Sequence, residues 1–560
     1  MKKTNKNFSE DFILKYKAAI YAKLTKDQFS DILGIKSESL VRRRLAIFKE
    51  RGLDLPYLAS GTNEISQKQQ DKYNEYIIKN SNVSEKNERV KLDKKIYVIS
   101  AAQNSTPIHA NFVAAMKNYC DIRDAELLII PYRYKNPTSI WSDNNEDAEW
   151  WDSSVTDHLI SSELNLCKRI RLMGHISIQP TAGEPLVGYD GQTGLDSAIF
   201  GHPKIQLKTV PTPSQSLPKI LSTTGACTMP NYTNSKAGHK GAFHHSLAAI
   251  VLEIDNENED IFHLRHIHGD DVTGAFYDLD KYYTTNECTD VDRISALVTG
   301  DTHAEFIDDE VLNGTYLNTD SIMQTLNPEV LVFHDLIDFY SRNHHHRGND
   351  IITIGKHRYG RNNVEEGLQC GADFVDTVSR PNTLNVIVKS NHDEAFDKWL
   401  REAEPKYDPE NAQFYHYMKY NQYKSIKMTD TGFDSFDPFE FWCNNPENKR
   451  GLKNLDNTVF LSRSRSFEVN NIELGLHGDI GTGGSRGSIK QFSKIGPKCI
   501  IGHSHSPGIY EGAYQVGVSA KLNLEYVKGQ PSSWLHTHCL VYPDGKRTLI
   551  NVINGKWRRT

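Results

Sequence analysis

Residues 294–303 read ISALVTGDTH, a short apolar run that is followed at once by an aspartate and a histidine. The run has the length and composition of a buried strand, and Gly300 marks its end. Asp301 and His303 therefore stand where a strand finishes. Binding sites of open α/β sheets form outside the carboxyl ends of their strands, so this stretch predicts a fold class and the place of a site.

The same pattern, an apolar strand that runs into metal-type side chains, recurs four more times towards the C-terminus. The four stretches are EVLVFHDLID (329–338), TLNVIVKSNHD (383–393), NIELGLHGD (471–479) and KCIIGHSH (498–505). Aspartate, histidine and asparagine suit borderline divalent cations, and cysteine is absent from these strand ends. Two such cations, about 3.5–4 Å apart, need a shared carboxylate and mixed nitrogen and oxygen ligands. One strand-end aspartate is more often a cap or a core group, but five such ends in order predict a metal site.

In this order the motifs resemble those of the calcineurin-like metallophosphoesterase superfamily, in the branch that contains the SbcD-like DNA nucleases. The superfamily pattern is D-x-H, then G-D-x-x-D, then G-N-H-D/E, then a single H, and then G-H-x-H. The resemblance covers residues 295–550, under half of the chain. Two glycines of the pattern are replaced, by His334 and Ser390, which affects turn geometry more than ligation.

The resemblance implies a site with two divalent cations, with Mn²⁺ expected and Mg²⁺, Fe²⁺ or Zn²⁺ as alternatives. The implied ligands are Asp301, His303 and His505 for the first metal, Asn391, His477 and His503 for the second, and Asp335 as the bridge. His392 is implied to be a catalytic acid rather than a ligand, and Asp393 its catalytic partner. A solvent-facing acid is the alternative interpretation of Asp393. The implied reaction is in-line attack on phosphorus by a metal-activated water.

Composition and pattern divide the 560 residues into four segments. Residues 1–58 are predicted to be a small helical domain with a helix-turn-helix outline, and the polar residues 59–93 a linker, with a solvated helix as the alternative. Residues 94–290 show a strand-helix-strand pattern and are predicted to be a middle α/β domain of unknown role. Residues 291–560 are the segment similar to metallophosphoesterases, which implies a β-sandwich flanked by helices. The predicted fold class is therefore α/β.

Three groups of basic residues are candidate contacts for nucleic acid. Residues 1–55 have more Lys and Arg than Asp and Glu, although the whole chain has a formal net charge of −6. The candidates are Arg42, Arg43 and Arg44 in the head, His344, His345 and Arg347 after the second motif, and Arg486 in the Gly-rich stretch GTGGSRGS. A docking helical bundle, an exposed basic turn and a bare flexible loop are the respective alternatives. Such residues would contact the phosphate backbone of a nucleic acid without recognising its base sequence.

A basic head beside a phosphoesterase favours a polymeric nucleic acid as the substrate. The stretches GHSHSPGIYEGAYQVGVS (502–519) and SSWLHTHCLVYPDGKRTLINVINGKW (532–557) also resemble phosphoesterases of tailed phages. More narrowly, the whole architecture is similar to the pre-early proteins that T-odd siphophages use to destroy host DNA. This resemblance implies a metal-dependent DNase, with DNA as its partner, in the cytoplasm of an infected bacterium.

Two other functions remain open at this point. One is a protein or small-molecule phosphatase whose N-terminal block mediates assembly into a homo-oligomer. The other is a DNA-binding regulator with an inactive phosphoesterase domain, against which the intact ligand set argues. Fold alone does not choose among these.

The composition also excludes several classes of protein. No run approaches the 18 apolar residues that a membrane span needs, and no apolar stretch of a secretory signal follows the basic N-terminus. The eight cysteines are scattered and form no CxxC pair, a reduced, intracellular pattern rather than a disulfide framework. We therefore expect a cytoplasmic chain without a membrane span.

Overall fold

The computed structural model describes most of the chain, in two compact units, Met1–Leu92 and Asp93–Thr560. The described residues are 10–32, 58, 66–75, 94–134, 150–213, 216–343, 346, 348–430, 432–445, 450–524 and 527–559. Each unit has its own buried apolar side chains.

The described part of the N-terminal unit contains short helices that pack through aromatic and small side chains. Two of these helices are α1 (Glu10–Tyr21) and α2 (Lys26–Ile32). The rings of Tyr16 and Phe29 meet edge to face, with centroids 5.3 Å apart. Thr25 caps α2, because its hydroxyl accepts from the Gln28 amide over 3.4 Å while its own amide donates to Gln28 Oε1 over 2.9 Å.

The rest of the predicted head cannot be compared with the structure. The expected third helix, with Arg42, Arg43 and Arg44, lies outside the described residues, so the helix-turn-helix interpretation stays a prediction. Within the predicted linker, residues 67–75 are helical. Gln69 Nε2 donates to the backbone oxygen of Lys23 over 3.1 Å, which ties this helix to the end of α1.

In the C-terminal unit, a six-stranded sheet carries the first three motifs. Its strands, in order, are β18 (Thr458–Leu461), β15 (Leu384–Val388), β14 (Val330–Phe333), β13 (Ala296–Val298), β24 (Thr537–Val541) and β25 (Arg547–Asn551). The first four run parallel to one another, and β24 and β25 are antiparallel. The loops after β13, β14, β15 and β18 therefore leave the sheet at the same edge.

A ten-stranded sheet carries the last two motifs. Its strands, in order, are β19 (Glu468–Val469), β20 (Ile472–Glu473), β21 (Lys498–Ile501), β23 (Ala513–Gln515), β22 (Gly508–Tyr510), β6 (Gln206–Val210), β7 (Lys219–Thr223), β5 (Ser197–Phe200), β4 (Ile170–Met173) and β3 (Glu163–Cys167). Half of this sheet comes from residues before 224 and half from residues after 467. The boundary predicted near residue 290 thus separates two segments of the chain that pair in one sheet.

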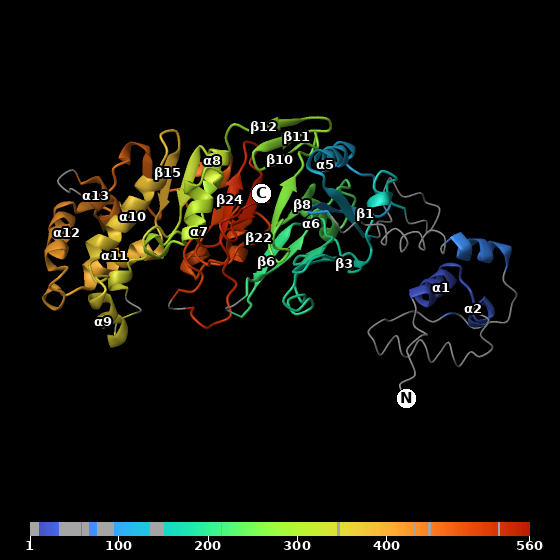
Figure 1. Ribbon diagram of the computed structural model, residues 1–560, viewed down its shortest axis with the longest axis horizontal. Coiled ribbons are helices and arrows are strands. Elements are labelled where there is room, and N and C mark those ends of the chain that lie inside the picture. The colour runs from blue at the N-terminus through green and yellow to red at the C-terminus, as the bar shows by residue number, and fades with distance from the viewer. Residues whose placement is uncertain are drawn as a thin grey trace. The chain divides into compact units, whose positions relative to one another are not determined.

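Three smaller sheets and several helices complete the unit (Figure 1). The smaller sheets are β2 (Glu126–Tyr132), β1 (Ile96–Gln103), β8 (Ala248–Ile254) and β9 (Phe262–His268), then β10 (Phe276–Asp278), β11 (Lys281–Tyr283) and β12 (Cys288–Asp290), then β16 (Lys427–Thr429) and β17 (Gly432–Asp434). The α-helices are α5 (Ala110–Arg123), α6 (Lys236–His244), α7 (Asp309–Leu312), α8 (Ile322–Leu326), α9 (Asp350–Arg358), α10 (Val364–Val378), α11 (Asn391–Glu402), α12 (Ala412–Lys424), α13 (Pro438–Asn444) and α14 (Ile489–Phe492).

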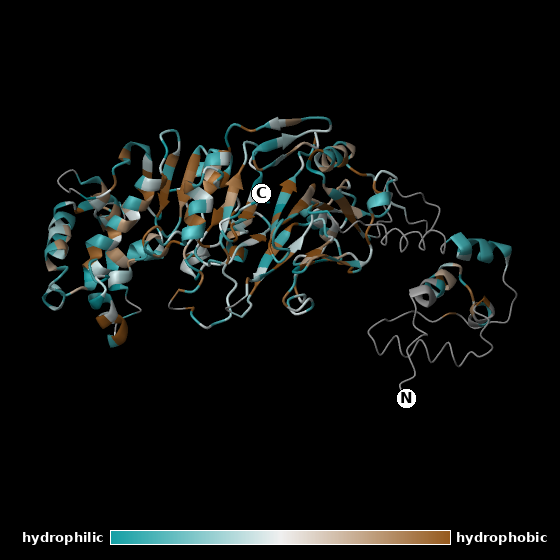
Figure 2. Ribbon diagram, viewed as in Figure 1, coloured by the Kyte–Doolittle hydropathy of each residue, from teal (hydrophilic) through white to brown (hydrophobic). Residues whose placement is uncertain are grey.

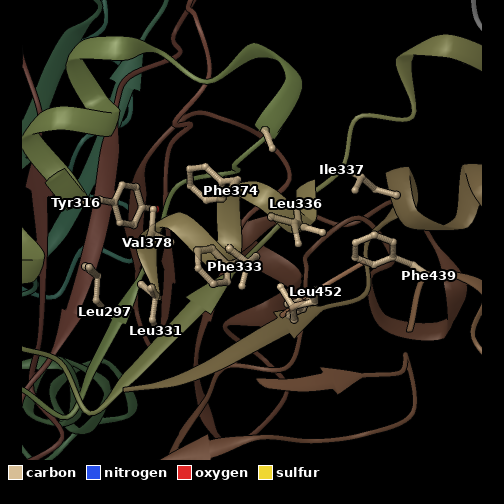
Figure 3. Close-up of a cluster of buried hydrophobic side chains, with 14 of the residues drawn as sticks. Leu297, Tyr316, Leu331, Phe333, Leu336, Ile337, Phe374, Val378, Phe439 and Leu452 are labelled. Carbon is tan, nitrogen blue, oxygen red and sulfur yellow. The ribbon is translucent and has the colours of Figure 1, made fainter. Parts of the chain in front are cut away.

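The largest buried cluster lies between the six-stranded sheet and the helices beside it. Figure 3 shows Phe333 and Leu331 of β14 close to Phe374 and Val378 of α10. α10 is amphipathic, and its buried residues recur every three or four positions, which places one apolar face against the sheet. Figure 2 shows the same division, with hydrophobic colour concentrated on the central strands. This core fixes the strand ends on which the candidate site is built.

The α/β fold class is confirmed, since helices and several mixed sheets make up the C-terminal unit. Among the residues that the structure describes, no helix combines the length and the apolar character needed to cross a bilayer.

Candidate metal centre

Three neighbouring parallel strands deliver the first group of polar side chains. β13, β14 and β15 lie side by side, and the loops that follow them contain Asp301, Asp335 and Asn391. Asp301 and Asp335 are buried to 0% and 1% exposure. Because the strands are parallel and in order, the segments that follow them leave the sheet at one edge. Asp301 and Asp335 each offer a carboxylate oxygen to one potential ligand group there.

The second group comes from the other sheet. β20 and β21 pair in parallel in the ten-stranded sheet, and His477 and His503 follow them. The two sheets approach closely at Gly502, where a Cβ would lie 2.2 Å from Asp301 Oδ1. Only glycine fits there. The sequence patterns did not indicate that two different sheets supply the predicted ligands.

The predicted ligands converge on Asp335. Its Oδ2 lies 3.3 Å from His477 Nε2 and 3.7 Å from His303 Nε2. His505 Nε2 lies 3.1 Å from His303 Nε2 and 3.2 Å from Asp301 Oδ2. Among the described residues, three groups of three potential ligand atoms lie within 4.8 Å of one another: His303, Asp335 and His505, then Asp301, Asp335 and His477, then His303, Asp338 and His392. Asp335 belongs to the first two groups, the position expected of a bridging carboxylate.

The other two predicted ligands are His503, which lies beside His477, and Asn391, which follows β15. The His503 ring is 5.4 Å from the His477 ring, centroid to centroid. Asn391 begins α11, and its Oδ1 is buried without a hydrogen-bond partner.

The backbone at the candidate ligands is strained. His303, Asp335, His503 and His505 have φ values of 44°, 44°, 71° and 61°, in the left-handed region that non-glycine residues rarely adopt. Each such residue costs about 1–3 kcal/mol, and such residues cluster at functional sites. Four of them in one group indicate that the fold maintains this arrangement for function.

Several buried polar atoms of the group have no hydrogen-bond partner. They are both carboxylate oxygens of Asp301, Asp335 Oδ1, Asn391 Oδ1, His477 Nδ1 and His505 Nδ1. Leaving such atoms unpaired is costly, so each calls for an explanation. Oxygen and imidazole nitrogen donors without thiolates fit borderline divalent cations, which would satisfy them. The residues present therefore fit a metal centre.

The charges inside the group affect one another strongly. Burial, reinforced by Asp335, raises the pKa of Asp301 to about 7. Burial would also raise the pKa of Asp335, but His477, His392 and His303 outweigh it and hold that pKa well below its usual range. Burial lowers the pKa of His477, but Asp335 outweighs it and raises this pKa to about 9. A proton on His477 therefore compensates the charge of Asp335.

His392 lies beside the group at the start of α11, and its neighbour is Asp338. His392 Nδ1 is 3.1 Å from the backbone oxygen of Asp338 and 3.6 Å from Asp338 Oδ1. The same carboxylate accepts from His303 Nδ1 over 2.9 Å. A carboxylate behind a histidine ligand fixes its tautomer and its orientation. The sequence interpretation quoted Asp338 in the second motif but gave it no role.

Asp393 has a structural contact in place of the predicted one with His392. Its carboxylate accepts from the amide and the hydroxyl of Ser390 over 2.8 and 2.7 Å. The Ser390 hydroxyl in turn accepts from the Asp393 amide, which completes a capping box at the start of α11. Ser390, one of the two departures from the glycine pattern, is thus the N-cap of the helix that presents Asn391 and His392.

His334, the other departure, is a buried residue that the sequence interpretation did not include in the site. Both of its ring nitrogens are buried without a hydrogen-bond partner, and its ring lies 5.6 Å from that of His477. Burial lowers its pKa to about 3, so this imidazole is neutral.

Most of the candidate nucleic-acid contacts lie outside the described residues. These are Arg42, Arg43, Arg44, His344, His345 and Arg347. Arg486 is described and exposed, in the loop between β20 and α14, where Ile480 and Arg486 form a backbone bridge. Its role stays a prediction.

The fold and the site together define an α/β protein with a buried cluster of aspartate and histidine side chains where two sheets meet. The chain is 33% identical to Protein A1 of Escherichia phage T5 over 473 residues, which cover 83% of each chain. It belongs to the family of that phage protein, which confirms the expected relationship to phage proteins. No family model matches this sequence, and no solved structure matches it.

Proposed function

We propose that this chain is a phosphoesterase that uses two divalent cations to hydrolyse phosphodiester bonds in DNA. The observation that carries the proposal is the set of unpaired, buried oxygen and nitrogen atoms around Asp335, which belongs to two potential ligand groups. A carboxylate shared between two metals is the central requirement of two-metal phosphoryl chemistry. Mn²⁺ is the proposed metal, in keeping with the mixed oxygen and imidazole donors.

Most of the side chains of the centre have binding roles in this proposal. The first metal is assigned to Asp301, His303 and His505, the second to Asn391, His477 and His503, and the bridge to Asp335. When bound, the two cations would lower the pKa of a water ligand and neutralise charge on the phosphate. Asp338 holds the His303 ring through Nδ1, which leaves Nε2 for the metal.

His392 is proposed to donate a proton to the leaving oxygen. The Asp338 backbone oxygen faces His392 Nδ1, so Nε2 is the atom that can meet a substrate. The side chain is 19% exposed, in contrast to the fully buried His303 and His477. Burial lowers the pKa of His392, but Asp335 and Asp338 outweigh it and raise this pKa, which favours the protonated form.

DNA is proposed as the substrate on two grounds. The basic N-terminal segment would attract a polyanion. The relationship to a phage protein fits an enzyme that meets host DNA inside an infected bacterium. Neither ground fixes the cleavage pattern, so both linear and circular DNA belong in the test.

The test is to incubate the purified chain with linear DNA, circular DNA and a phosphotyrosine peptide, each with Mn²⁺, Mg²⁺, Zn²⁺ or EDTA. We expect cleavage of DNA with Mn²⁺, none with EDTA, and no phosphate release from the peptide. Phosphate release from the peptide without DNA cleavage would replace the proposal by the phosphatase alternative. DNA binding without hydrolysis of either substrate would favour the inactive regulator.

A further inference from the structure

Arg463 lies just beyond β18, at the same edge of the six-stranded sheet as the proposed metal ligands. Val388 and Leu461 pair at the ends of β15 and β18, and the Lys389 amide donates to the Leu461 oxygen over 3.1 Å. After Leu461 the chain reads SRSRS (462–466). This stretch therefore runs beside the loop that leads into Asn391.

The Arg463 guanidinium makes three charged hydrogen bonds. Nε donates to Glu394 Oε1 over 3.0 Å, and the two terminal nitrogens donate to the two carboxylate oxygens of Asp479 over 2.6 and 2.8 Å. The Arg463 and Asp479 side chains are 25% and 9% exposed. A forked pair of this kind is stronger than a single hydrogen bond and fixes the relative orientation of its two partners.

The two partners of Arg463 belong to two of the three segments that carry proposed ligands of the second metal, those of Asn391 and His477. Glu394 lies in α11, three residues after Asn391. Asp479 lies two residues after His477, and Gly478 between them has a φ of 114°. A Cβ at Gly478 would lie 3.2 Å from the Gly502 oxygen, so the chain turns sharply there. His477 can thus contact Asp335 while Asp479 contacts Arg463.

We propose that Arg463 is a positioning residue of the metal centre, which ties the Asn391 segment to the His477 segment and so holds the second metal's ligands together. The two segments follow strands of different sheets, β15 and β20, and Arg463 connects them directly. The inference rests on the two-metal centre of the proposed function but does not depend on the substrate.

The first test is a Mn²⁺ titration of the full chain, read as the number of bound ions and their affinities. The wild type should bind two Mn²⁺ per chain. Arg463→Gln should keep one ion at wild-type affinity and bind the other about 10–100-fold more weakly, the usual effect of losing a group that orients a ligand. Arg463→Lys should give an intermediate loss, because an ammonium group cannot make the forked pair.

A double variant separates positioning from a general loss of stability. Asp479→Asn should weaken the same ion, and Arg463→Gln with Asp479→Asn should be no weaker than the worse single variant, because both changes break one interaction.

Arg171→Gln is the matched control. Arg171 also bridges two carboxylates, Asp196 over 2.7 Å and Glu163 over 2.9 Å, and is 35% exposed. It lies in β4, and none of these three residues is in a segment that carries a proposed ligand. Its loss should leave both Mn²⁺ affinities unchanged.

The inference would be overturned if a folded Arg463→Gln variant bound both Mn²⁺ ions with wild-type affinity. If that variant fails to fold, Asp479→Asn decides by the same criterion. A wild-type chain that binds two Mn²⁺ but cleaves no DNA would remove the DNase proposal and leave this inference standing. A wild-type chain that binds no Mn²⁺ would overturn both.

Discussion

Two sheet edges in the C-terminal unit are alike in topology and differ in how their buried polar atoms are paired. β13, β14 and β15 are parallel neighbours at one edge, and β1 and β2 are parallel neighbours, with α5 between them in sequence, at the other. Polar side chains stand at the strand ends in both places. At the first edge, Asp301 and Asp335 have carboxylate oxygens without a hydrogen-bond partner.

At the second edge the polar side chains pair with one another. Gln103, the last residue of β1, donates through Nε2 to the Asn231 oxygen over 2.8 Å. It accepts at Oε1 from the hydroxyl of Tyr132, the last residue of β2, over 3.4 Å. Asn231 Nδ2 donates to Thr106 Oγ1 over 2.9 Å. This network is complete without a ligand.

The difference shows that a polar residue at a strand end is a weak indication of a site until its hydrogen bonds are examined. A paired network stabilises the fold, whereas buried atoms left unpaired cost free energy that only a ligand recovers. The five predictions below test this contrast, from the largest expected effect on the metal centre to the smallest.

Asp335→Asn should have the largest effect, because it removes the carboxylate that two of the three potential ligand groups share. We expect loss of both Mn²⁺ ions and a fall in turnover of at least about 10²-fold, as expected when a major electrostatic group is removed. Metal analysis of the purified variant and a DNA cleavage assay measure the two effects. Two ions at normal occupancy with near-native turnover would show that Asp335 is not the bridge.

His392→Ala should separate chemistry from binding. As a proton donor outside the ligand groups around Asp335, His392 should contribute about 10²–10⁴-fold to turnover, while both Mn²⁺ ions and the affinity for DNA stay close to wild type. Single-turnover cleavage and a Mn²⁺ titration give the comparison. Loss of an ion in this variant would mean that His392 is a ligand.

Asp338→Asn tests the residue to which the sequence interpretation gave no role. Its carboxylate holds His303 Nδ1 over 2.9 Å, so the amide should weaken the first metal by about 10–100-fold. The Mn²⁺ titration should then show weaker binding of the first metal, whereas Arg463→Gln should weaken the second. An unchanged titration would show that the His303 ring needs no second group.

The metal centre should make the stability depend on pH in opposite directions with and without the metals. Asp301 has a folded pKa of about 7 against an ordinary 3.8, and His477 one of about 9 against 6.5, so the folded chain holds protons that the unfolded chain releases. Both contributions are present at low pH and are lost as pH rises through these folded values.

These two groups together should therefore lower the free energy of unfolding in EDTA by about 4 kcal/mol between pH 6 and pH 9, at roughly 1.4 kcal/mol for each unit of pKa difference. Asp301→Asn should remove its share of this loss, and saturating Mn²⁺ should reverse the slope, because metals bind the deprotonated ligands. Urea unfolding of the wild type and the variant at each pH provides the measurement. Equal pH profiles of the wild type and Asp301→Asn in EDTA would contradict the charge balance described for the centre.

Much of the site could be predicted from sequence because its ligands directly follow short apolar strands. Parallel strands bring their ends together, so Asp301, Asp335 and Asn391 could be placed at one edge from pattern alone. The position of His477 beside these residues could not be predicted in this way. His477 follows β20, and β20 and β21 belong to a sheet whose other half comes from residues before 224. Pairing across that separation leaves no local pattern in the sequence.

The contacts of two residues, Asp393 and Asp338, were not predicted from the sequence, and both have local causes. The motif resemblance drew attention to Asp393 as a partner of His392, yet S-x-x-D from Ser390 is itself a helix-start signature, and the structure has the capping box there. Asp338 belongs to the second motif, but its contact with His303 could not be predicted from the sequence. That contact depends on the turn after β14, where Asp335 and Phe339 both have positive φ. Backbone turns of this kind are poorly encoded by residue type.

Gln103→Ala, at the second edge, should leave the metal centre unchanged. Removing this amide deletes its two buried hydrogen bonds, with Asn231 and Tyr132, so the free energy of unfolding should fall by about 1–3 kcal/mol. Mn²⁺ affinity and DNA cleavage should match the wild type. In EDTA at pH 9, Asp301→Asn should have the opposite sign and stabilise the chain, because it removes a buried charge that has no hydrogen-bond partner. If Gln103→Ala instead lost Mn²⁺ or activity at unchanged stability, the second edge would be part of the functional site, and the pairing of polar atoms would no longer separate the two edges.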